Sequence, residues 1–212
     1  MPTVMLAVYA LVGLVHEVAA LRFWDVVRKV TKAALMPVLL VYYAVAAHPV
    51  LVAVIVAIAF AWLGDVVLIR KGDPRFFRGG MAAFLLSHVF YIVALVSLTH
   101  GVHIVALVAS VVVALAAEIL LPRIINPPKA LRGAILVYGI VILAMSVCAL
   151  QFALASPSTY SALLFVGSLV FIASDVLMTY FAFGTKPRSF DALTMLPYIV
   201  AQGLIVVGLA AA

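Results

Sequence analysis

The sequence predicts an all-α integral membrane protein with eight transmembrane helices, and three observations support that prediction. Hydrophobic residues make up 68% of the 212 residues and charged residues only 9%, a composition that cannot give a soluble globule with a wettable surface. Most hydrophobic runs approach the length of about 20 residues that a helix needs to cross a hydrocarbon core of about 30 Å. The basic residues lie only between certain runs. We therefore treat residues 1–212 as a single transmembrane domain.

The hydrophobic runs, taken in order along the chain, give the expected helices. They fall roughly at 3–21, 33–47, 50–69, 80–99, 103–121, 133–154, 160–183 and 191–211. The second run, near 15 residues long, is short for a span, and its helix has room to begin earlier, at Val30. Because the connections are short, any chemistry must take place among the helices.

All thirteen Lys and Arg lie in four connecting segments, which alternate with connections that carry none. Because short basic loops stay in the cytoplasm, this pattern places both termini outside and the four basic segments inside. It favours a cell membrane, and for so short a chain a bacterial inner membrane. The formal charge of +6 is spread over the segments, which argues against a nucleic-acid partner. The segments carry Arg22, Arg28, Lys29 and Lys32; Arg70, Lys71, Arg75 and Arg78; Arg123, Lys129 and Arg132; and Lys186 and Arg188.

Two aspartates inside hydrophobic runs are the main candidates for a functional site. Asp65 and Asp175 each lie about fifteen residues into a run that travels from outside to inside, so we expect them at similar depth in the cytoplasmic half. A carboxylate at the centre of a bilayer costs about 2.5 to 3.5 kcal/mol on insertion scales, and such groups usually have a function. The alternative is that each aspartate only caps or pairs within the bundle.

The spacing of these aspartates suggests an internal duplication. They are 110 residues apart, close to half the chain. Two related halves with four helices each would be parallel, with their axis along the membrane normal. Glu17 and Glu118 correspond only loosely, each near the cytoplasmic end of the first helix of its half.

Other polar residues map to the midplane or the cytoplasmic half and are candidates for substrate binding. Tyr198 and Gln202 are four residues apart and so share a helix face, as do His88 and Tyr91 at a spacing of three. His88 alone is equally consistent with a packing role. His16 has no second histidine at helical spacing, so we predict no metal. The substrate-binding candidates are Lys32, His88, Tyr91, Tyr138, Ser174, Tyr198 and Gln202.

Several motifs, in order along the chain, resemble those of the YhhN-like family of membrane lysoplasmalogenases. Their order, spacing and placement on successive helices carry the resemblance, which covers nearly the whole chain. One departure is Ala33, where the family often has proline. The motifs are Lys32-x-x-x-x-Pro37, Gly64-Asp65-Val66-Val67-Leu68, Phe77-x-x-Gly80-x-x-x-Phe84-x-x-x-His88-x-x-Tyr91, Tyr138 with Met145, Gly167-Ser168 leading to Phe171 and Ser174-Asp175, and Tyr198-x-x-x-Gln202.

The resemblance implies an eight-helix enzyme that hydrolyses the vinyl ether bond of a lysoplasmalogen. The products would be a fatty aldehyde and glycerophosphoethanolamine or glycerophosphocholine. The family's active residues carry over to Asp65 and Asp175 as the catalytic pair. The implied partners are an alkenyl lysophospholipid and the membrane lipids, and no cofactor is expected. Lys32, or Arg70, Arg75 and Arg78, would meet the phosphate.

The chemistry of the reaction agrees with a pair of carboxyl groups. Hydrolysis of an enol ether needs a proton on the vinylic carbon and then water on the resulting cation, as in the carboxylate pairs of glycosidases. One protonated and one ionised aspartate supply both functions. Paired intramembrane aspartates are also typical of proton-coupled or lipid transporters, which is the main alternative. A lipid-binding or scaffolding protein without activity is the third.

Overall fold

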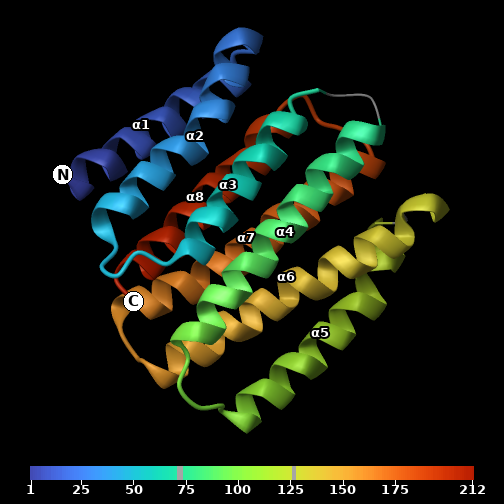
Figure 1. Cartoon of the computed structure of the whole chain (residues 1–212). Helices are drawn as coiled ribbons and strands as arrows, with labels where there is room; N and C mark the ends of the chain where they lie inside the picture. The colour runs from blue at the N-terminus through green and yellow to red at the C-terminus, as the bar shows by residue number, and fades with distance from the viewer. Residues whose placement is uncertain (71–73, 126–127) are drawn as a thin grey trace.

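The computed structural model describes residues 1–70, 74–125 and 128–212, with the backbone alone for residues 74, 114, 117, 118 and 120–125. Lys71 and the side chains of Glu118 and Arg123 therefore lie outside the described part. The described residues form eight α-helices, shown in Figure 1. Their bounds are α1 Pro2–Leu21, α2 Asp25–Ala46, α3 Val52–Val67, α4 Pro74–Leu98, α5 Ile104–Ile125, α6 Lys129–Ala155, α7 Thr159–Phe183 and α8 Phe190–Ala210.

The fold is that of a multi-pass membrane protein, as the composition predicts. Six helices of the described part are long and apolar enough to cross a bilayer, namely α1, α2, α4, α6, α7 and α8. Helix α3 has 16 residues and is shorter than a full span, and the described apolar part of α5 covers Ile104–Val113. The all-α fold is confirmed. Eight spans and outside termini remain predictions.

Three helices begin earlier than the hydrophobic runs predict. Helix α2 begins at Asp25 and not at 33, α4 begins at Pro74 and not at 80, and α6 begins at Lys129 and not at 133. Hydropathy alone ends a span at the first charge, whereas a helix can continue into the interface, where long basic side chains reach water. The prediction that the basic segments are loops is therefore wrong for eight basic residues, which lie in helices: Arg28, Lys29 and Lys32 in α2, Arg75 and Arg78 in α4, Arg123 in α5, and Lys129 and Arg132 in α6. As a result, Lys32 lies two turns inside α2.

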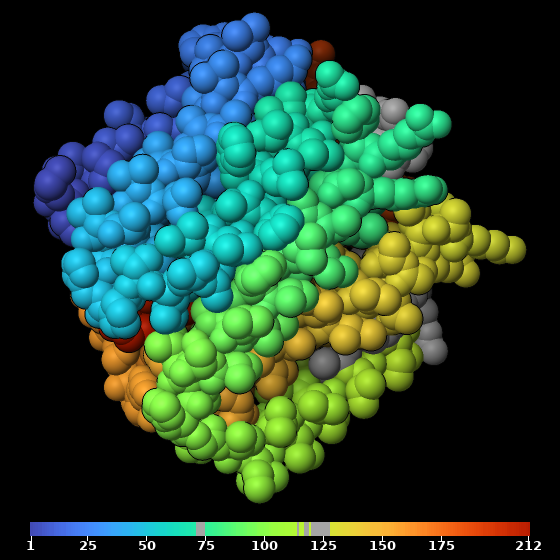
Figure 2. Space-filling view, viewed as in Figure 1, coloured from blue at the N-terminus to red at the C-terminus, as the bar shows by residue number. Residues whose placement is uncertain are grey.

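Six helices form a closed ring, and two lie outside it. Neighbours in the ring are α2, α3, α4, α6, α7 and α8, with α8 returning to α2. Helix α1 packs outside against α2 and α8, and α5 packs outside against α6 and α7. Figure 2 shows α2, α3 and α4 side by side on one face, followed by α6 and α5. Both termini lie at one end of the bundle, and the helix ends with basic residues gather at the other (Figure 1).

The ring agrees in part with the predicted pair of related halves. Asp65 on α3 and Asp175 on α7 occupy corresponding helices, as do the outer helices α1 and α5. The second contacts of the outer helices differ, because α1 packs against α8 whereas α5 packs against α7. Internal duplication therefore remains a prediction.

The tightest helix pair is α7 with α8, and two glycines permit it. A Cβ atom at Gly208 would lie 2.7 Å from the carbonyl oxygen of Tyr160, and one at Gly167 would lie 3.0 Å from the backbone nitrogen of Ile205. Small residues let helix backbones approach in membranes, where van der Waals packing drives association. This contact fixes α7 relative to α8.

Replacing Gly208 by alanine should therefore destabilise the bundle. The added methyl group would force α8 away from the backbone of α7, at a cost of about 1 to 3 kcal/mol, visible as a lower Tm in detergent. Gly133→Ala is the matched control, because nothing lies within 4 Å of a Cβ atom there. That variant should be unchanged or more stable by up to about 1 kcal/mol. Equal Tm values for the two variants would contradict this account of the packing.

Candidate active site inside the helix ring

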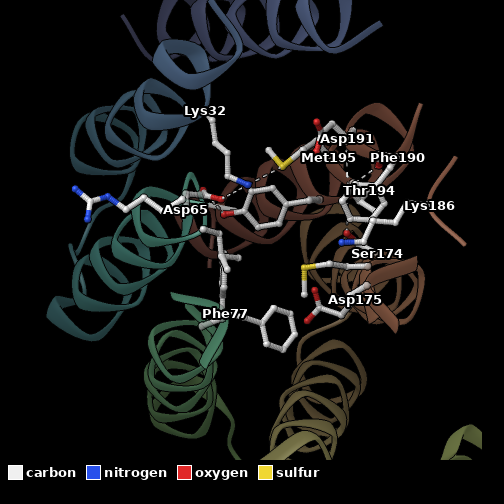
Figure 3. Close-up of a pocket in the computed structure, with 16 residues that line it drawn as sticks. Lys32, Asp65, Phe77, Ser174, Asp175, Lys186, Phe190, Asp191, Thr194 and Met195 are labelled. Carbon is white, nitrogen blue, oxygen red and sulfur yellow. Dashed lines mark hydrogen bonds and ion pairs between the residues drawn. The ribbon is translucent and has the colours of Figure 1, made fainter. Parts of the chain in front are cut away.

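A cavity of about 170 Å³ lies inside the ring, at the end that carries the basic residues. Figure 3 shows its lining, which comes from α2, α3, α4, α7 and α8 and from the segments beside them. Both predicted catalytic aspartates belong to it. The lining residues are Lys32, Asp65, Leu68, Arg70, Phe77, Phe84, Ser174, Asp175, Met178, Ala182, Lys186, Phe190, Asp191, Thr194, Met195 and Tyr198.

Asp65 is 1% exposed and has two polar partners from other helices. Its Oδ2 accepts a hydrogen bond of 2.7 Å from the hydroxyl of Tyr198 on α8. Its Oδ1 lies 3.4 Å from the Nζ of Lys32 on α2, and the same Nζ donates to the sulfur of Met195 at 3.2 Å. A buried carboxylate is stable only when it is paired and hydrogen-bonded, and these contacts provide both.

A proline in α2 accounts for the local geometry next to Lys32. Pro37 has no N–H, so the carbonyl of Ala33 loses its helical partner. The indole Nε1 of Trp62 on α3 donates to that carbonyl at 2.9 Å. This hydrogen bond fixes α2 to α3 one residue after Lys32, and so helps to hold Lys32 beside Asp65.

Asp175 is half-buried on α7, and its surroundings differ from those of Asp65. Its Oδ2 accepts a hydrogen bond from the hydroxyl of Tyr138 on α6. The neighbouring Ser174 lines the cavity, but its hydroxyl donates to the carbonyl of Thr194 at 3.0 Å and so connects α7 to α8. Among the described residues, no basic side chain lies within ion-pair distance of Asp175.

The two aspartates line one cavity but are not hydrogen-bonded to each other within the described part of the chain. Each carboxyl group is bonded to a different tyrosine. In Figure 3 they come from different sides of the cavity. Both carboxyl groups therefore border the same cavity.

Three predicted binding residues lie behind the cavity and not in its lining. Tyr91 donates to the Oε1 of Gln202 at 2.9 Å, and both side chains are buried. The Nδ1 of His88 bonds to the carbonyl of Phe84, and its ring packs edge-on against Phe171 with centroids 4.7 Å apart. These side chains support the cavity wall. Lys32, Ser174 and Tyr198 do line the cavity, and Tyr138 lines a small cavity beside it.

The basic residues near the cavity differ in part from those expected. Arg70 and Lys186 line it, whereas Arg75 and Arg78 are exposed and do not. Lys32 faces Asp65. In the described residues, no three His, Cys, Asp or Glu side chains form a group that could hold a metal ion, and the absence of a metal remains a prediction.

Sequence reasoning missed four lining residues on α8, namely Phe190, Asp191, Thr194 and Met195. Asp191 lines the cavity and forms an ion pair of 3.0 Å with Arg28 of α2, and Met195 contacts Lys32. A signal was present, because Asp191, Met195 and Tyr198 are spaced by four and three residues and so share one helix face.

Comparison with known proteins identifies the family. The family model described as YhhN family matches residues 27–209, a range that contains every aspartate, lysine and tyrosine of the site. The chain belongs to the YhhN family. This membership confirms the resemblance seen in the motifs, and the family includes lysoplasmalogenases. No curated protein and no solved structure matches the chain.

The hydrogen bond from Tyr198 should contribute measurably to stability. Tyr198→Phe leaves an oxygen of buried Asp65 without its donor, at a cost of about 1 to 3 kcal/mol and a lower Tm. Tyr180→Phe is the control, because Tyr180 is 47% exposed. An unchanged Tm in Tyr198→Phe would show that the bond to Asp65 contributes nothing to folding.

Proposed function

We propose that this YhhN family member hydrolyses the vinyl ether bond of lysoplasmalogens, releasing a fatty aldehyde and glycerophosphoethanolamine or glycerophosphocholine. The observation that carries the proposal is that Asp65 and Asp175 line one cavity in different electrostatic surroundings. Hydrolysis of an enol ether needs an acid and a carboxylate on the same substrate, and the family's known activity supports this choice.

The surroundings of the two aspartates suggest which of them is the acid. Lys32 places a positive charge 3.4 Å from Asp65, which stabilises a carboxylate there. Asp175 has the neutral phenol of Tyr138 as its hydrogen-bond partner. We therefore assign Asp65 as the ionised group and Asp175 as the proton donor. Lys32 and Tyr198 act as positioning residues, because each contacts Asp65 and affects the reaction by orienting that carboxylate.

The reaction then follows in three steps. Asp175 gives its proton to the vinylic carbon remote from the oxygen, and the adjacent carbon becomes an oxocarbenium ion that the carboxylate of Asp65 stabilises. In the second step, water adds to that carbon and gives one proton to Asp65, which leaves a neutral hemiacetal. In the third step, the hemiacetal breaks at the carbon–oxygen bond to glycerol: Asp65 gives its proton to the glycerol oxygen, and the hemiacetal hydroxyl gives its proton to Asp175. The aldehyde is released, and both aspartates have returned to their starting protonation states.

The cavity suggests how a lysophospholipid would lie. Arg70 and Lys186 line it and carry the charge that a phosphate needs. At about 170 Å³ the cavity can hold the polar part of the lipid and the vinyl ether, but not a long chain. A small adjoining cavity lined by Tyr138 shares Leu68, Phe77, Phe84 and Met178 with the first, so the alkenyl chain would leave past these apolar side chains.

The basic rim of the cavity also supports a location in the membrane. Arg70 and Lys186 belong to the segments that positive-inside reasoning places in the cytoplasm. The site would then open toward the cytoplasmic half of a cell membrane, and for a bacterial member toward the inner leaflet of the inner membrane.

Product analysis tests the activity directly. Purified protein in detergent should release aldehyde from lysoplasmalogen but not from the ester lysophospholipid of the same head group. In deuterated water the aldehyde should carry one deuterium on the carbon next to the carbonyl, because that carbon receives the catalytic proton. Mass spectrometry measures both results. Movement of intact lipid that requires sealed vesicles, without any aldehyde, would instead identify a transporter.

Variants of the cavity test the assigned roles. Asp65→Asn and Asp175→Asn should each lower kcat by about 10²-fold or more, since general acid–base catalysis contributes about 10²- to 10⁴-fold. Lys32→Met should lower kcat more than it raises KM, because Lys32 faces Asp65. Asp25→Asn is the matched control, with a side chain that is 70% exposed outside the cavity. Full activity in either cavity aspartate variant would remove that residue from the mechanism.

A further inference from the structure

A long apolar groove runs along the outside of the bundle between α1 and α8. It measures about 850 Å³ and shares no lining residue with the aspartate cavity. On α1 its lining extends from Leu6 to Leu21, about 22 Å at the rise of an α-helix. The sides of the groove are open to the membrane, because Leu14 and Leu196 are 62% and 55% exposed.

The floor of the groove is fixed by direct contact between the two helices. The hydroxyl of Tyr9 on α1 donates to the carbonyl of Ile199 on α8 at 2.7 Å. A Cβ atom at Gly13 would lie 3.0 Å from the Cγ2 of Ile199, so the backbone of α1 rests on this side chain. The packing of α1 against α8 therefore fixes the groove, and the groove is long enough for an extended hydrocarbon chain.

The cytoplasmic end of the groove is polar. Glu17 lines it one turn before Leu21, and its Oε1 has no hydrogen-bond partner among the described residues. A carboxyl oxygen accepts a hydrogen bond in either protonation state. Arg22 follows the lining residue Leu21, and Arg188 precedes the lining residue Ser189, and both arginines are exposed. The order along the groove is therefore apolar wall, hydrogen-bond acceptor and positive charge.

We propose that this groove binds a lysophospholipid as a second lipid site. The single chain lies along α1 and α8, the free glycerol hydroxyl donates to Glu17, and the phosphate meets Arg22 and Arg188. In a lysophospholipid the chain, the glycerol hydroxyl and the phosphate follow one another in this order. Along the groove, the apolar wall, Glu17 and the two arginines follow one another in the same order. A diacyl phospholipid has no free glycerol hydroxyl. A second copy of the chain, seated on the groove by two-fold symmetry about the membrane normal, would bring two Glu17 side chains to the same depth of one interface.

The site is distinct from the proposed hydrolysis, so its test does not use turnover. The probe is an ester-linked lysophosphatidylethanolamine with a photoreactive diazirine in its chain, added to the full-length protein in nanodiscs. Labelled peptides should come mainly from α1 and α8, and Ala10→Phe, which fills the groove, should lower that labelling about tenfold. Ala59→Phe is the control, at an exposed position on α3 outside the groove.

The same labelling persists in Asp65→Asn if the site is independent of the cavity, and it remains informative if the protein releases no aldehyde. Equal labelling in Ala10→Phe and Ala59→Phe, or labels spread evenly over all lipid-facing helices, would each overturn the proposal.

Glu17 supplies the test of lipid class. Glu17→Leu should lower labelling by the lysophospholipid about three- to tenfold, the effect of one lost hydrogen bond, and leave labelling by the diacyl lipid of the same head group unchanged. Glu17→Gln keeps an acceptor oxygen and should retain the preference for the lysophospholipid. An equal loss of labelling by both lipids in Glu17→Leu would show that Glu17 does not bind the free glycerol hydroxyl. Equal labelling by both lipids in the wild type would show the same.

Discussion

The ion pair between Lys32 and Asp65 is the interaction on which the interior of this bundle depends. Both groups lie among membrane helices, where an unpaired charge is expensive, and they come from different helices. Removing one partner of a buried pair typically costs about 3 to 5 kcal/mol, because the other charge is left alone. Two residues of α8 form the other hydrogen bonds of the pair: Tyr198 donates to Asp65, and Met195 accepts from Lys32. The pair therefore ties α2, α3 and α8 together around a polar centre.

A polar centre of this kind requires helices that approach closely and at defined angles. The bond from Trp62 to the carbonyl that Pro37 leaves free fixes α2 against α3. Glycines at 167 and 208 allow α7 to lie against α8, and Ser174 joins the same two helices. These contacts set the distance across the cavity, so the positions of Asp65 and Asp175 follow from packing that lies outside the cavity itself.

Much of this architecture could be predicted from the sequence. Hydropathy and the placement of basic residues predicted an all-α membrane bundle, and the similar depth expected of Asp65 and Asp175 agrees with their place in the lining of one cavity. Helix starts were less predictable, because amphipathic turns such as the one at Asp25 do not differ from loops in hydropathy. The extent of the cavity along the helices was not predictable either. His88 lies one turn after the lining residue Phe84, and Gln202 one turn after the lining residue Tyr198, where they contact other side chains and not the cavity.

Helix α8 lines both the inner cavity and the outer groove. Asp191, Met195 and Tyr198 point into the ring, while Leu196 and Val200 line the outer groove. A helical repeat of 3.6 residues assigns these two sets to different faces, so polar residues on one face do not meet the membrane on the other. The same helix supplies Tyr198 to Asp65 and Ile199 to Tyr9, in consecutive positions. A shift or rotation of α8 would therefore alter the cavity and the groove together, which gives occupancy of the outer site a direct physical route to the geometry of the aspartates.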